Sequence, residues 1–284
     1  MLNINQLIID AFVAKLRGVF QEMYGDSEPL YAHTVEFSAR QALEHIANTD
    51  TLYHNIEHTG NVALAGSAIL KGKQIHEGSI TPRDWMHFML ALVFHDIGFV
   101  RGLCKADQGD NIATGIKDKT VVWQDGRSAA ILTPYHVDRS KLFLQERFKR
   151  SGLLDIDITV VSDYIERTRF PVPDDPSYTN TDDLPGLVRA ADLIGQLADP
   201  NYLRKIPALF YEFEETGMNK AFGYHDPGEM RSKYPSFFSN TVEPYIHDAL
   251  PFLRITQEGQ QWITSLYGNV LVAKQGNNQN PLMV

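Results

Sequence analysis

The stretch Leu90-Ala91-Leu92-Val93-Phe94-His95-Asp96-Ile97-Gly98 is an apolar run that ends with two strong metal-binding side chains. Burying an imidazole and a carboxylate without partners costs on the order of several kcal/mol. A divalent cation would offset that cost, because neutral imidazole and carboxylate are both good ligands for zinc, manganese or iron. A satisfied core pair is the alternative that the dipeptide alone leaves open.

The residues before this stretch predict a helix that carries the pair inward. Thr81 is a suitable N-cap, Pro82 suits the first helical position, and Asp84 completes a capping box. His95 and Asp96 follow Phe88 and Leu92 by seven and four residues, so they continue the apolar stripe of that helix. Gly98 is expected to end it, and residues 99–126 are expected to form a long loop beside the pair.

Two histidines four residues apart stand earlier in the chain, in Tyr53-His54-Asn55-Ile56-Glu57-His58. Asn55 is a plausible N-cap for a helix that continues through residues 62–70. His58 then lies in the first turn and His54 just before it. A metal or catalytic role and a structural role are both open for this pair.

A second acidic residue appears late in the chain, where Asp192 interrupts an apolar helix expected over residues 184–198. Such a carboxylate needs a partner. Metal ligation is the leading explanation, and pairing with Arg189 or with the backbone is the alternative. His136, which follows the long loop, is a further candidate ligand.

The remaining segments favour one all-α domain. Apolar residues recur at helical spacing over residues 5–24 and 29–46, and no strand-rich block or repeat appears. We expect a single domain over residues 1–275, with N-terminal helices in 1–48, a catalytic core in 53–250 and a flexible tail in 276–284.

Composition limits the partners and the compartment. The 284 residues carry 26 Lys and Arg against 35 Asp and Glu, a formal net charge of -9, which disfavours nucleic-acid polymers and anionic membranes as partners. The single cysteine, Cys104, favours a reducing compartment, and the N-terminus lacks the pattern of a signal peptide. These features predict a cytoplasmic protein.

The order of a His, a His-Asp pair and a late Asp on separate helices resembles the HD-domain metal-dependent phosphohydrolases. Residues 53–62 look like the Tyr-His-Asn-x-x-His-Ala-x-Asp-Val signature of class I cyclic-nucleotide phosphodiesterases. Phe94-His95-Asp96, Ala190-Ala191-Asp192-Leu193 and residues 211–217 are similar to later segments of the same catalytic domains. The resemblance covers residues 53–250 and implies an HD-domain, phosphodiesterase-like helical bundle with its metal site between helices.

The resemblance implies a site with two divalent cations (Zn, Mn, Mg or Fe). His58, His95, Asp96 and Asp192 would hold the first, and Asp96 would bridge to the second. His54 would be the general acid, so His54 and Asp96 are the expected catalytic residues. The implied reaction is hydrolysis of a phosphodiester or phosphomonoester by a water that the metals activate, and the expected substrate is a small, nucleotide-like molecule.

The match to the phosphodiesterases has departures that bear on the substrate. Asn61 replaces the aspartate of the signature, and Tyr234 stands where the family has a purine-binding glutamine three residues before Phe237. Tyr53, Asn55, Arg169, Tyr234 and Phe237 are the candidate substrate-binding residues, with Phe237 expected to stack on a base and Arg169 to meet a phosphate. A second copy of the chain is a candidate partner, as in a homodimer.

Two other functions stay open on the sequence. Some proteins of the same superfold hold two irons and oxidise a C–H bond, as myo-inositol oxygenase does. They use extra histidines between the His-Asp pair and the last Asp, where this chain has His136. A non-catalytic HD domain that binds a nucleotide is the third hypothesis, and the presence of His54 argues against it.

Overall fold

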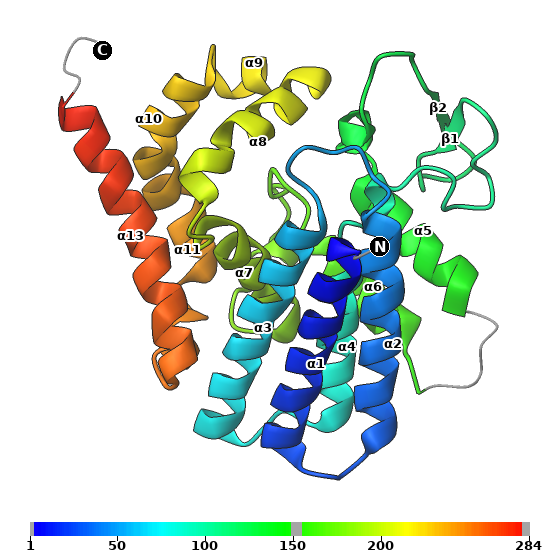
Figure 1. Cartoon of the computed structure of the whole chain (residues 1–284), viewed down its shortest axis with the longest axis vertical. Coiled ribbons are helices and arrows are strands. Elements are labelled where there is room, and N and C mark those ends of the chain that lie inside the picture. The colour runs from blue at the N-terminus through cyan, green and yellow to red at the C-terminus, as the bar shows by residue number, and fades with distance from the viewer. Residues whose placement is uncertain (1–2, 149–154, 280–284) are drawn as a thin grey trace.

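Helices make up most of the computed structural model, which describes residues 3–148 and 155–279 (Figure 1). The α-helices are α1 (Ile4–Tyr24), α2 (Pro29–Ile46), α3 (Ile56–Glu77), α4 (Pro82–Phe94), α5 (His136–Phe148), α6 (Ile158–Glu166), α7 (Leu184–Leu197), α8 (Tyr202–Thr216), α9 (Met218–Phe222), α10 (Pro227–Phe237), α11 (Glu243–Ile246), α12 (Leu250–Leu253) and α13 (Gln257–Gln279). Short 3-10 turns are η1 (Ile97–Phe99), η2 (Ala129–Leu132) and η3 (Pro176–Tyr178), and η4 (Phe238–Val242) is a π-helical turn. The expectation of an all-α protein is confirmed at this level.

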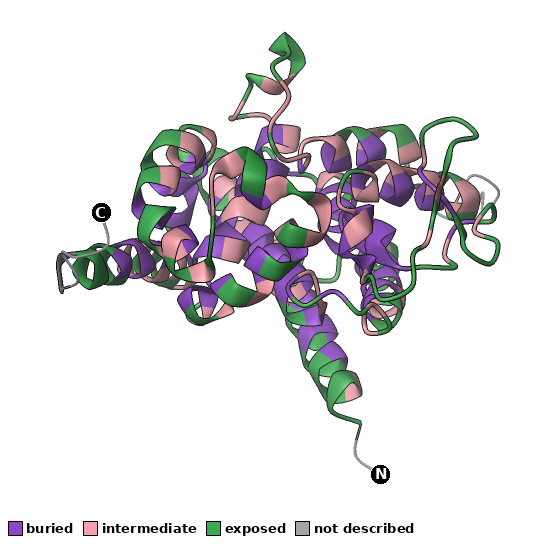
Figure 2. Ribbon diagram, turned by 90° about the horizontal axis from the view of Figure 1, so that it is seen from above, coloured by how far each residue is buried: buried purple, intermediate pink, exposed green. Residues whose placement is uncertain are grey.

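Helix α3 lies at the centre and packs against α7, α4, α1 and α12. Its small residues Ala63, Ala65 and Gly66 are fully buried or nearly so and let neighbouring helices approach closely. On α7, a Cβ at Gly195 would lie 2.5 Å from the Cα of Val62, so these two backbones are in direct contact. Figure 2 shows the buried residues on the inward faces of the central helices. The site is therefore built where α3 and α7 meet.

One hydrophobic core runs through the described chain, from Ile9 of α1 to Ala273 of α13. The capping box predicted at Thr81 and Asp84 is present, with both of its hydrogen bonds formed. Because α3 and α4 follow each other as antiparallel neighbours, the first turn of α3 lies beside the end of α4. No described helix is long and apolar enough to cross a membrane.

Helix α4 ends at Phe94, four residues before the predicted end at Gly98. Ser140 of α5 explains the early stop. Its hydroxyl donates to the carbonyl of His95 (2.7 Å) and accepts from the N–H of Gly98 (2.9 Å), so backbone groups that leave the helix are still paired. His95 and Asp96 therefore lie at the helix end and not on a continuing stripe.

The segment 99–126, predicted as a loop, contains a small antiparallel hairpin of β1 (Asn111–Ala113) and β2 (Thr120–Val122). The fully buried Arg139 of α5 holds the segment in place. Its guanidinium donates to the carbonyls of Gly98 (2.6 Å) and Val100 (2.8 Å) and pairs with Asp107 (3.0 Å). These charge-assisted hydrogen bonds hold the segment next to η1.

The C-terminal helix reaches further than the sequence indicated. α13 continues to Gln279, so the start of the tail that was predicted at Gly276 lies within the helix. The side-chain amide of Asn277 donates to the carbonyl of Ser232 (2.8 Å), which ties the last turn to α10. Residues 280–284 of the expected tail lie outside the described residues.

Candidate metal centre

Three helices deliver the four predicted ligands to one point. His58 lies in the first turn of α3, His95 and Asp96 lie at the end of α4, and Asp192 lies on α7. The start of α3 is set by Asn55, whose side chain accepts from the N–H groups of Glu57 (3.0 Å) and His58 (3.3 Å). The N-cap thus fixes the position from which the His58 ring enters the site.

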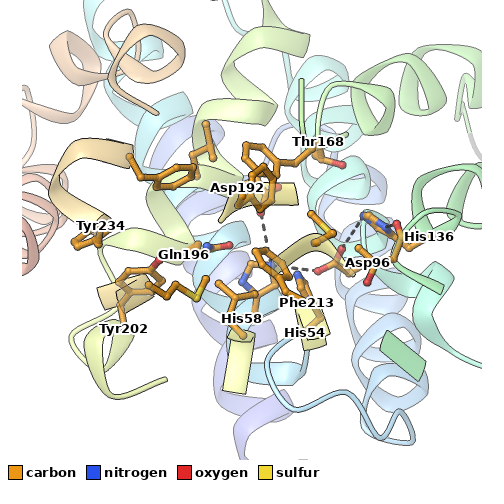
Figure 3. A pocket seen from close by; sticks show the side chains of 18 of the residues that line it. His54, His58, Asp96, His136, Thr168, Asp192, Gln196, Tyr202, Phe213 and Tyr234 are labelled. Atoms are coloured by element: carbon orange, nitrogen blue, oxygen red, sulfur yellow. Dashed lines mark hydrogen bonds and ion pairs between the residues drawn. The ribbon is translucent and has the colours of Figure 1, made fainter. Parts of the chain in front are cut away.

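The ligand atoms of these residues converge, and Figure 3 shows three of the four residues, His58, Asp96 and Asp192. The Nε2 atoms of His58 and His95 each lie 3.1 Å from Oδ2 of Asp96. Both Nε2 atoms also lie 3.6 Å from Oδ1 of Asp192. His58, His95 and Asp192 form one group whose ligand atoms are all within 4.8 Å of one another, and His54, His58 and Asp96 form a second.

Unpartnered buried atoms indicate that a cation fits this cluster. Nε2 of His95 and Oδ2 of Asp96 are both buried and have no hydrogen-bond partner. His95 donates its other ring nitrogen, Nδ1, to the carbonyl of Leu92 (2.6 Å), which leaves the Nε2 lone pair aimed at the carboxylates. A neutral core pair would leave these atoms unsatisfied, whereas a divalent cation bound by two imidazoles and two carboxylates would satisfy them.

The electrostatics of the cluster also favour positive charge at its centre. Burial disfavours a charged imidazole at His95, but the carboxylates of Asp96 and Asp192 outweigh burial and raise the pKa of His95 to about 9. Arg189, the alternative partner for Asp192, instead donates to the carbonyls of Arg167 (3.3 Å) and Tyr178 (2.9 Å). Asp192 therefore does not pair with Arg189, and its carboxylate lies with His58 and His95 in the cluster.

His136 faces Oδ1 of Asp96, whereas His58 and His95 face Oδ2. Its Nε2 lies 3.7 Å from Oδ1 of Asp96, and its Nδ1 donates to the carbonyl of Thr133 (2.6 Å). Burial lowers the pKa of His136 to about 4, so the ring is neutral and its Nε2 lone pair is available. Asp96 thus presents one oxygen to His58 and His95 and the other to His136, an arrangement suited to bridging two cations.

His54 is held by a carboxylate that the sequence analysis did not single out. Nδ1 of His54 donates to Oε2 of Glu212 (2.5 Å), and Oε1 of Glu212 accepts from the N–H groups of Tyr53 (2.5 Å) and His54 (3.3 Å). Glu212 lies on α8 and is 1% exposed. Burial opposes charging of His54, but Glu212, Asp96 and Asp192 outweigh it and raise the pKa of His54 to about 9. The similarity of residues 211–217 to the phosphodiesterases was the feature of the sequence that could have identified Glu212.

Phe99 lies between the two outer histidines of the site. Its ring stacks on His54, with centroids 4.8 Å apart and planes at 23°, and on His136, at 4.6 Å and 12°. Phe99 belongs to η1, the turn that follows the His-Asp pair, and is 1% exposed. It therefore sets the spacing between His54 and His136. No motif in the sequence identified this residue.

A pocket opens onto the cluster, and two of the five candidate substrate-binding residues line it. Tyr234 and Phe237 line the pocket, together with His54, His58, Asp96, His136 and Asp192. Tyr53, Asn55 and Arg169 are not among the lining residues.

Each of these three residues has a structural role instead. Tyr53 is 3% exposed and its ring packs on those of His54 and His58. Asn55 is the cap of α3. The Arg169 guanidinium is bound by Glu166 (2.5 Å) and Asp138 (3.0 Å), so it has no free charge to offer a phosphate.

Gln196 is a lining residue that the sequence analysis missed. It follows Asp192 by four residues on α7, so both side chains leave the same face of the helix. Figure 3 shows Gln196 between the candidate metal-binding residues and Tyr202. The i to i+4 spacing from Asp192 was the signal that could have identified it.

The fold and the site together define a class: a helical protein with a His/Asp cluster able to hold a metal at one end of a largely apolar pocket. The chain belongs to the Npun_R2479-like family, whose family model matches residues 2–276. No curated protein sequence matches it.

Proposed function

We propose that this protein is a metal-dependent phosphohydrolase of the HD-domain kind that hydrolyses a small phosphoester. The observation that carries the proposal is the His54–Glu212 pair, which lies beside the cluster of His58, His95, Asp96 and Asp192. Of the pair, His54 lines the pocket, as His58, Asp96 and Asp192 also do. A phosphoryl group at the cluster would place its leaving oxygen near His54. A purely structural metal site would not need such a pair.

Each group in the site would have its own role in the reaction. Divalent cations supply Lewis acidity, which lowers the pKa of a water and neutralises phosphoryl oxygens. His58, His95, Asp96 and Asp192 would hold one cation, and Asp96 with His136 would face a second. Glu212 orients His54 through Nδ1, so Nε2 of His54 carries the proton for the leaving alkoxide. Overall, water and the ester give the alcohol and the phosphate, and solvent reprotonates His54.

One observation supports a second candidate function, that of a di-iron oxygenase of the same superfold. His136 is neutral and turns Nε2 toward Asp96, so it supplies the extra histidine that such enzymes use between the His-Asp pair and the last Asp. Only one such histidine faces Asp96 among the described residues, and the oxygenase has no use for the His54–Glu212 pair as a proton donor. These points favour the phosphohydrolase.

Metal analysis with an activity screen tests the proposal. The purified protein is expected to hold divalent metal and to hydrolyse at least one of three probes: a cyclic nucleotide, a mononucleotide or bis(p-nitrophenyl) phosphate. His54→Ala is expected to keep the metal and to lower kcat about 10²–10⁴-fold, as loss of a general acid does. The matched control is His76→Ala, an exposed histidine near the other end of α3, which should change neither property.

Two results would contradict the proposal. Iron pairs with no phosphoester turnover would favour the oxygenase. Phosphoesterase activity that survives His54→Ala unchanged on each phosphoester tested would remove His54 from the chemistry.

A further inference from the structure

The walls of the pocket are apolar well beyond the metal-binding residues. Four phenylalanines from different segments line it, namely Phe170, Phe213, Phe222 and Phe237. Their rings form a chain of contacts, each with centroids 6.0 Å apart: Phe213 with Phe222, Phe222 with Phe170, and Phe170 with Phe237. Leu193, Leu209, Met218 and Met230 complete the apolar lining. All four rings are only half-buried, so an apolar ligand body would cover surface that is now in contact with water.

Apart from His54 at the candidate metal centre, no described residue that lines the pocket has a positive side chain for a second anionic group. None of the residues that line it is Lys or Arg, and its only carboxylates are the two metal-binding ones, Asp96 and Asp192. Arg169, which precedes the lining residue Phe170, is already paired with Glu166 and Asp138. A ligand with one phosphate can place it at the metals, but a second phosphate that lay beyond the metals and His54 would meet no compensating charge.

Few free hydrogen-bond donors are available for a sugar, and the hydroxyl of Tyr234, which is buried without a partner, is one of them. The hydroxyls of Thr133 and Thr168, which both line the pocket, donate to the carbonyls of Ala130 (2.6 Å) and Ile165 (2.8 Å). Outside the candidate metal centre and its histidines, the remaining polar lining groups are neutral: Gln196 and the tyrosines Tyr202, Tyr224 and Tyr234. Figure 3 places Tyr202 and Tyr234 on the side of the pocket away from His136. Ribose hydroxyls buried against the phenylalanines would lose hydrogen bonds to water without replacement.

From this lining we infer that the substrate is a phosphoester with a single phosphate and an uncharged, mainly apolar body, and not a nucleotide. The inference rests on the proposed function for the phosphate end. The phosphate lies at the metal-binding residues, and the body packs among the phenylalanines. Gln196 and the tyrosines allow at most a neutral polar substituent.

Two primary-alcohol monoesters test the inference, because their leaving groups are alike. The metal-loaded protein is expected to hydrolyse 2-(2-naphthyl)ethyl phosphate with kcat/KM about tenfold or more above that for adenosine 5′-monophosphate, with adenosine diphosphate the poorest. Phe213→Ala should raise KM for the naphthyl ester about tenfold with little change in kcat, since uniform binding is lost. The matched control is Phe37→Ala, an exposed ring on α2 that does not line the pocket, and it should change nothing.

A binding measurement separates this inference from the proposed function. By calorimetry, the protein as purified should bind 2-(2-naphthyl)ethanol about tenfold more tightly than adenosine, and Phe213→Ala should remove that preference. If this preference holds while no phosphoester is turned over, the pocket assignment stands and the phosphohydrolase proposal falls. If adenosine binds as well as the naphthyl alcohol, or the adenine nucleotides are hydrolysed as well as the naphthyl ester, the inference is overturned.

Discussion

Asp96 owes its position to the point at which α4 stops. Its backbone has φ -103° and ψ 3°, outside the helix, so its carboxylate turns away from the apolar stripe and toward three histidines. Ser140 makes that turn stable by pairing the carbonyl of His95 and the N–H of Gly98. A local backbone feature thus turns this carboxylate toward the three histidines.

Asn55 provides a residue-scale prediction that separates capping from substrate binding. Asn55→Ala should lower the free energy of unfolding by about 0.5–2 kcal/mol, because two N–H groups in the first turn of α3 lose their acceptor. KM should stay the same, since Asn55 does not line the pocket. Urea unfolding and steady-state kinetics measure the two effects. Asn55→Asp keeps an acceptor oxygen and should restore stability, whereas a rise in KM at unchanged stability would assign Asn55 to the substrate.

Residue types and helical spacing were enough to select His54, His58, His95, Asp96 and Asp192, which the structure brings together. They did not identify Glu212, since its partner His54 is 158 residues away in sequence and only the tertiary fold joins them. Phe99 was missed for a similar reason, because an apolar residue after a helix looks like ordinary core. Arg169 was assigned to a phosphate because its salt bridges to Glu166 and Asp138 depend on the turn after α6 and on α5.

At the scale of elements, the contact between α3 and α7 sets the distance from His58 to Asp192. Gly195→Ala would place a Cβ 2.5 Å from the Cα of Val62, so the two helices must separate. We expect the free energy of unfolding to fall by about 1–3 kcal/mol, as in overpacked cores. Metal affinity should also weaken, because the ligands on the two helices move apart. Urea unfolding and metal titration measure these effects.

The matched control for this change is Gly268→Ala on α13. A Cβ there meets no heavy atom within 4 Å, so stability should stay level or rise by about 0.4–1 kcal/mol through reduced freedom of the unfolded chain. Equal effects of the two substitutions would contradict a special role for the α3–α7 contact.

The sequence predicted helix boundaries correctly where N-caps determine them. The predictions were wrong where tertiary contacts determine the boundary. The sequence-predicted caps at Asn55 and Thr81 are both formed. The end of α4 was placed four residues late, because Ser140 of a distant helix terminates it. The hairpin of β1 and β2 was read as loop, since its strands are three residues each and depend on Arg139 to hold the segment.

At the scale of the whole molecule, the candidate metal centre joins α3, α4 and α7, three helices of one hydrophobic core. Removing bound cation would leave Nε2 of His95 and Oδ2 of Asp96 buried without partners, so chelation should destabilise the entire fold. At a free cation concentration 100 times the Kd, binding contributes about 2.7 kcal/mol, which sets the expected size of the loss. Thermal unfolding with and without a chelator measures it as a drop in Tm.

The His95→Ala variant makes that measurement specific to the site. It lacks one of the four ligands, so adding chelator should lower its Tm much less than that of the unaltered protein. His76→Ala, the exposed histidine on α3, should respond to chelator as the unaltered protein does. A Tm of the metal-loaded protein that is insensitive to chelation would mean that the cluster is a protonated His/Asp network. In that case the four side chains would be held together by protons in place of a cation, and the phosphohydrolase proposal would lose its metal.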